Sequence, residues 1–168
     1  MQNAKDTFYL ALRNRLATLN PARTITLAGV ARPGILVEEA ESPTAQMPSD
    51  VFVLRWSGAG MNTQLPAWLE SQTCEICYWT RGSDTNADMD RGRLMTEMDA
   101  ELAAMLQPAN SQKLSVSSAG QDLPMNTNVF WLDAIYSPVK HDGERLSRTT
   151  TVQVFSLQET LSNGGEER

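Results

Sequence analysis

The sequence is poor in the residues that enzyme and metal sites most often use. Its 168 residues include one histidine, His141, and two cysteines. A structural zinc site takes four such ligands, and acid–base catalysis centred on one histidine in a predicted turn is uncommon. No G-x-S-x-G nucleophile elbow occurs. We therefore expect no enzyme activity, no cofactor and no metal.

Long apolar runs are also missing. No run approaches the roughly 18–20 residues of a membrane span, and Met1–Asp6 lacks the basic-then-apolar order of a secretory signal. We expect synthesis and folding in a cytoplasm, without a membrane partner. An apolar content of 41% is enough for one compact domain, predicted over residues 1–157, with a disordered tail over 158–168.

Positive charge is scarce overall, because the net charge is −6. This balance argues against direct, sequence-specific nucleic-acid binding, which favours a basic stripe. The distribution is uneven. Residues 1–37 hold five basic side chains and one acidic, a net +4, whereas residues 38–168 hold nine basic and nineteen acidic, a net −10. Copies of such a chain could stack head to tail, or the two sets could be solvated surface charges.

A strand followed by a helix is the most informative stretch that is present. Alternation over residues 73–80 places Ile76 and Tyr78 on one face and Cys77 and Trp79 on the other. Large apolar side chains on both faces predict an interior strand.

The helix that follows is predicted to be capped by Thr85 and Asp88 and to end before Pro108. Its apolar residues recur every three or four positions and form one stripe: Leu94, Met98, Leu102, Met105 and Leu106. The acidic residues Glu97, Asp99 and Glu101 are expected to face water.

The rest of the chain predicts further strands around these two elements. A first helix over residues 4–19 should bury Phe8, Leu12, Leu16 and Leu19. Strands are predicted over 24–30, 35–38, 51–57, 129–136 and 147–157, with turns at 32–34 and at Asp142–Gly143. Loops are predicted over 39–49, over 58–71 with a short helix from Pro66, and over most of 109–128. The fold class is α+β, a mixed and mostly antiparallel sheet with two main helices packed on it.

Three patterns imitate functional sites. Cys74 and Cys77 have C-x-x-C spacing, but their odd separation in a strand points the thiols to opposite faces, which favours two structural cysteines. The run from Gly58 to Thr63 imitates a dinucleotide loop without its third glycine. The acidic residues of the second helix spread around its axis, which favours a solvated face over a metal site.

One loop carries a candidate protein interface. Trp68 lies in a predicted loop with Leu65 and Met61, and exposed aromatic residues are typical of interfaces. Arg13 and Arg15, outside the apolar face of the first helix, complete the candidate set. Packing of the loop against the sheet is the alternative.

The order of these elements resembles a known family. An N-terminal Y-L-A-L-R-N-R-L helix precedes E-I-C-Y-W-T-R-G and A-D-M-D-R-G-R-L-M-T-E-M, and a hairpin from V-F-W-L-D-A-I-Y to T-T-T-V-Q-V-F closes the chain. This arrangement is similar to the tail-completion proteins of long-tailed phages, the tail terminator and minor tail protein U-like group. The resemblance implies a structural virion protein that forms a ring, often hexameric, on the tail tube and joins it to a head-completion protein. Assembly would take place in the cytoplasm of a bacterial host.

A second hypothesis comes from another class of protein. The chain could be a small bacterial ligand-binding or enzyme domain with a pocket near Trp56 and Trp79. A pocket shared by these two side chains would favour that hypothesis.

Overall fold

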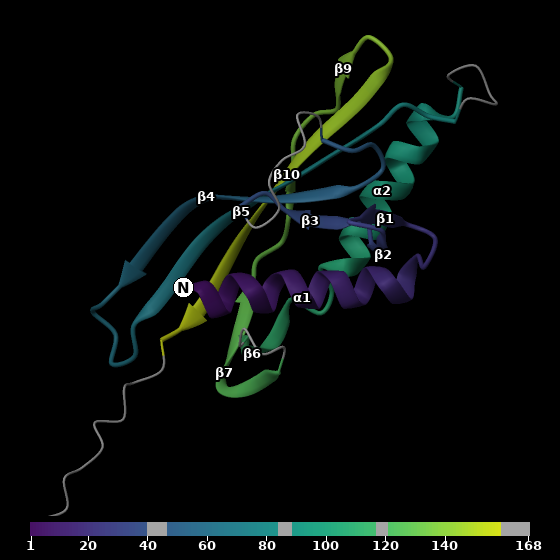
Figure 1. Cartoon of the computed structure of the whole chain (residues 1–168). Coiled ribbons are helices and arrows are strands. Elements are labelled where there is room, and N and C mark those ends of the chain that lie inside the picture. Colours follow the sequence, from purple (N-terminus) through teal and green to yellow (C-terminus); the bar gives the residue numbers. More distant parts are fainter. Residues whose placement is uncertain (40–46, 84–88, 117–120, 159–168) are drawn as a thin grey trace, which may run out of the picture.

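A computed structural model describes residues 1–39, 47–83, 89–116 and 121–158. Two helices, α1 (Gln2–Leu19) and α2 (Arg91–Met105), pack on an eight-stranded sheet (Figure 1). The order in the sheet is β3 (Ile35–Val37), β4 (Phe52–Asn62), β5 (Leu69–Thr80), β10 (Arg145–Leu157), β7 (Asp122–Trp131) and β6 (Asn110–Val116). Among the strands of the described residues, only β3 and β4 pair in parallel. The predicted α+β class is confirmed.

The short strands lie around this main sheet. β8 (Ile135–Tyr136) and β9 (Lys140–Asp142) both pair with β10. β1 (Thr24–Leu27) and β2 (Val30–Pro33) form a separate hairpin.

The pairing of β5 with β10 runs the length of the molecule. Twelve register pairs extend from Thr80 opposite Leu146 to Leu69 opposite Leu157. β4 pairs with the other side of β5, so β5 is the interior strand that its sequence predicted.

The two faces of the sheet differ in what covers them. Even-numbered residues of β5 and β10, such as Ile76 and Val152, are buried with α1 and α2 in one core. Odd-numbered residues of the same strands, such as Thr73 and Phe155, are half-buried on the other face. Strand alternation therefore separates a helix-covered face from an open face.

Helix α1 buries most of its predicted stripe. Phe8, Leu12 and Leu16 are fully buried, and Phe8 meets Trp131 edge-on at 5.1 Å between ring centres. Leu19 is 50% exposed, so its predicted burial is wrong. The helix ends at Leu19, and the C-cap residue Asn20 has non-helical backbone angles.

Helix α2 begins at Arg91, and Asp90 at its N-cap places a negative charge at the positive end of the helix dipole. The predicted capping residues Thr85 and Asp88 lie outside the described residues. Met98 is buried as expected, together with Leu102, Met105 and Leu106. In place of Leu94, however, the buried residue of the first turn is Met95. The buried stripe is therefore displaced by one position at its start.

The N-terminal hairpin turns earlier than the sequence predicted. Its turn is Ala28–Gly29, with φ of 47° and 82°, and not residues 32–34. Two successive positive φ values fit the twist of a two-residue hairpin turn. Ile35–Val37 consequently does not return along β1, and pairs in parallel with β4 instead.

The two long predicted loops are mostly strands. β4 continues through a bulge to Asn62, and its outer half pairs with residues 69–73 of β5, so no helix forms at 66–71. A Cβ added to Gly60 would lie 3.0 Å from the Ser71 Oγ, so glycine permits this close pairing. Residues 109–128 contain β6 and the first part of β7.

The C-terminal strands follow the prediction with one change. The expected strand over 129–136 is divided between β7 and β8. The turn at Asp142–Gly143 is confirmed, and Gly143 has a φ of 55°. The predicted tail lies outside the described residues from 159 onward. Neither α1 nor α2 is long and apolar enough to cross a membrane.

Replacing Leu102 with alanine should lower the free energy of unfolding by about 2–5 kcal/mol, because its fully buried side chain would leave a cavity beneath the sheet. Urea unfolding measures the change. Glu97→Ala on the exposed side of the same helix is the matched control and should change stability by less than about 0.5 kcal/mol. Equal effects of both variants would contradict this packing.

Candidate interaction surfaces

The outer half of the β4–β5 hairpin extends beyond the helices and ends in apolar side chains (Figure 1, lower left). We call residues 61–68 the arm tip. Met61, Leu65 and Trp68 are 36%, 44% and 49% exposed there. The Trp68 carbonyl accepts a hydrogen bond of 2.8 Å from the Gln158 amide, which ties the end of the tip to the strand beside it. The structure thus gathers three of the predicted interface residues at one place.

The two predicted interface arginines lie elsewhere, on α1. Arg15 donates to the carbonyl oxygens of Met105 and Pro108, both at 2.8 Å, and lies over the Trp131 ring. Its burial there lowers the pKa of its guanidinium. Arg13 is half-buried and lies over Tyr9. Arg15 therefore holds α1 to the end of α2, a role that its sequence position did not reveal.

Other N-terminal cations are also paired within the chain. Lys5 Nζ lies 3.3 Å from a carboxylate oxygen of Glu39. Arg23 forms an ion pair with Glu101, which also accepts a hydrogen bond of 2.6 Å from Asn20. The expectation that Glu101 faces water is wrong, and the positive N-terminal segment is partly neutralised by its own chain.

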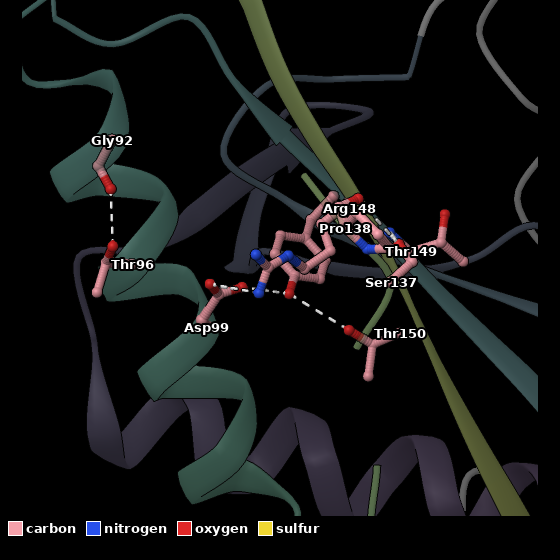
Figure 2. Close-up of polar contacts among 9 residues, drawn as sticks. Gly92, Thr96, Asp99, Ser137, Pro138, Arg148, Thr149 and Thr150 are labelled. Carbon is pink, nitrogen blue, oxygen red and sulfur yellow. Dashed lines mark hydrogen bonds and ion pairs between the residues drawn. The ribbon is translucent and has the colours of Figure 1, made fainter. Parts of the chain in front are cut away.

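A polar cluster joins α2 to the sheet, and Figure 2 shows Asp99 projecting from α2 toward Arg148. The Tyr78 hydroxyl donates to Asp99 Oδ1 at 2.5 Å, and Arg148 Nη1 donates to Oδ2 at 2.9 Å. Thr150 Oγ1 lies 3.3 Å from the Tyr78 hydroxyl. Asp99 was expected to face water, and this expectation is wrong. Burial and the bond to Asp99 raise the pKa of Tyr78.

A second surface feature surrounds Trp79 on the open face. A hollow of about 190 Å³ is lined by Met47, Trp79, Asp142, Arg145 and Ser147. We call it the Trp79 hollow. The guanidinium carbons of Arg81 and Arg145 lie 5.6 and 5.0 Å from the centre of the Trp79 ring. Arg145 also lies 3.4 Å from the exposed Asp142 carboxylate.

A larger hollow lies beside Trp56, at the start of α1. It has a volume of about 330 Å³, and Lys5, Asp6, Tyr9 and Glu39 contribute to its lining. Trp56 contacts Phe8 of α1 on the helix-covered face, whereas Trp79 lies on the open face. The two tryptophans therefore border separate hollows and do not share a pocket.

The remaining sequence candidates have structural surroundings. Cys74 and Cys77 are free thiols on opposite faces, as strand alternation predicts. Burial raises the pKa of Cys74, which disfavours its reactive thiolate. Gly58 and Gly60 lie within β4 and do not precede a helix. His141 is exposed in β9. Within the described residues, no three potential metal-binding side chains come together.

Comparison with known proteins does not assign the chain to a family. The sequence matches no family model, and no relative was found among curated proteins.

Replacing Asp99 with asparagine should destabilise the protein by about 2–3 kcal/mol, because Arg148 would lose the charge that its partly buried guanidinium faces. Chemical denaturation measures the loss. Glu97→Gln, on the exposed side of α2, removes the same charge without removing a described contact and should be close to neutral. A neutral Asp99→Asn would show that the cluster does not hold α2.

The stability of the protein should also fall at alkaline pH. The pKa of Tyr78 is raised in the folded protein, so above about pH 10 the unfolded chain releases this proton more readily than the folded one. The stabilising contribution is complete below pH 10 and is lost as the pH rises through the raised pKa. Urea midpoints between pH 8 and 11 should decline, and less steeply in Tyr78→Phe. Identical slopes in both proteins would contradict the assignment.

Proposed function

We propose that this chain is a structural, tail-terminator-like subunit of a phage or prophage tail. In this role, copies of it form a ring that caps the tail tube and connects it to the head. Its partners would be further copies of itself, the tube protein and a head-completion protein. The proposal combines the sequence resemblance with the surfaces of the folded chain.

The observation that carries the proposal is the exposed arm tip. Met61, Leu65 and Trp68 are exposed at the end of a hairpin whose tip extends beyond the helices. Clustered apolar side chains on a soluble protein commonly mark a protein contact, and tryptophan is enriched among the residues that dominate binding energy. A subunit whose paired strands extend from its core has a rigid element with which to reach a neighbour.

The placement of the ionisable side chains also supports a structural role. Asp99, Glu101 and Arg15 each connect one of the helices to another part of the fold. These charges maintain the shape of the subunit, which is what a repeated assembly requires.

The hollow beside Trp56 favours a second candidate, a ligand-binding domain. Its aromatic floor and its mixed charges from Lys5, Asp6 and Glu39 could hold a small polar ligand. A screen of metabolites for a rise in melting temperature would test this candidate, and the rise should be lost in Glu39→Gln. No shift across a broad panel would count against it.

Purified protein should form oligomers whose mass rises with concentration and reaches a closed size, as measured by light scattering and native mass spectrometry. Trp68→Ala should weaken association by about thirty-fold or more, since truncation of a central interface tryptophan costs roughly 2 kcal/mol. Ile135→Ala, which alters another exposed apolar residue, is the matched control. A monomeric mass at millimolar concentration would contradict the proposed function.

A further inference from the structure

The structure carries two chemically complementary surfaces at opposite ends of one strand. Trp68 immediately precedes β5, and Trp79 and Arg81 lie at its other end. We infer that the arm tip of one copy docks in the Trp79 hollow of the next copy, with Trp68 as the inserted side chain. This inference rests on the proposed self-assembly and assigns the contact that would produce it.

The separation of the two surfaces determines the kind of assembly. β5 contains 12 residues, and eleven steps of about 3.3 Å place its ends roughly 36 Å apart. Figure 1 shows the arm at the lower left and the β9–β10 turn, which borders the hollow, at the top. One copy cannot bring its own tip into its own hollow across this distance. A contact between two different surfaces joins copies head to tail and closes into a ring when the rotation permits.

The arm tip offers an aromatic surface and one donor. Residues 56–69 contain no charged side chain. The nearest charge along the hairpin, Glu70, is buried and paired with the Met1 ammonium. The exposed Trp68 indole can therefore offer its ring and its Nε1–H to a partner, and exposed Leu65 adds apolar surface on the same tip.

The Trp79 hollow offers the matching groups. The exposed Arg81 and Arg145 guanidinium groups already lie against one indole, that of Trp79, and the same planar cations can stack on a second. The Asp142 carboxylate and the Ser147 hydroxyl border the hollow and can accept the indole N–H. Met47 and Trp79 provide apolar contact. A volume of about 190 Å³ suits one large side chain better than a whole helix.

An acidic protein segment is the main competing occupant, because Arg145 lines the hollow and Arg81 lies against the Trp79 ring. Asp142 also lines the hollow, however, and would oppose an incoming carboxylate. A neutral aromatic residue satisfies both the cations and the carboxylate, so the observations favour the tip of a second copy.

Two full-length variants test this contact. The tip variant carries Leu65→Ser and Trp68→Ala, and the hollow variant carries Arg81→Glu and Arg145→Glu. Each should remain monomeric at concentrations where the wild type assembles. An equimolar mixture should form a 1:1 heterodimer and nothing larger in native mass spectrometry, because only one intact tip and one intact hollow remain to meet.

Matched controls separate this contact from general surface effects. Ile135→Ala and Arg93→Glu change an exposed apolar residue and an exposed arginine elsewhere, and both should assemble as the wild type does. Circular dichroism verifies folding. If the double arginine variant does not fold, the single variant Arg81→Gln is used in its place. The hollow of that variant should bind an intact tip at least ten-fold more weakly than the wild-type hollow does.

The outcomes also separate this inference from the proposed function. Wild-type assembly that persists in the hollow variant, or a mixture that stays monomeric, overturns the tip-to-hollow contact alone. If assembly does not change when Arg81 is replaced, and a polyglutamate peptide binds at the hollow, the site belongs to an acidic partner. This result also overturns the tip-to-hollow contact. A wild type that is monomeric at every concentration overturns the proposed function as well.

Discussion

The backbone pairing of β5 with β10 is the constraint on which the rest of the structure depends. Its register places Tyr78 opposite Arg148, and both side chains reach Asp99 on α2. A slip of one residue in either strand would turn that strand's member of the pair to the open face and break the cluster with Asp99. The same ladder carries the buried row that receives α1, so the position of both helices follows from one strand register.

This ladder also explains how surfaces far apart in space can belong to one rigid element. β5 is paired on both sides, with β4 and with β10, over nearly its whole length. The arm tip precedes its first residue, and the Trp79 hollow lies near its last. Because the paired strands resist bending, a partner bound at one end would be held at a defined distance and direction from a partner at the other. That property suits a subunit of a ring.

Much of the fold could be predicted because the spacing of apolar residues along the sequence indicates which face of a strand or helix is buried. Ile76 and Tyr78 identified β5, and the stripe through Leu102 identified α2. The arm was missed because glycines and small polar residues pair through their backbones, which leaves little periodic signal. Asp99 follows buried Met98 and lies at the margin of the apolar stripe of α2. This position in the sequence could have indicated that the acid is partly buried. Its partners on β5 and β10 could not be identified, since they depend on long-range strand pairing. Trp68 was recognisable as an exposed aromatic residue, whereas the hollow combines residues from distant segments.

The central claim is that the two ends of β5 meet between neighbouring copies. Photo-crosslinking from position 68 tests it most directly, with a photoreactive phenylalanine analogue in place of Trp68 in the otherwise intact chain. Mass spectrometry of a mixture of isotopically light and heavy copies then identifies the linked peptides. The head-to-tail arrangement predicts light–heavy crosslinks from position 68 to the peptides that contain Trp79 or Arg145. Crosslinks confined within single copies, or reaching mainly α1, would contradict it.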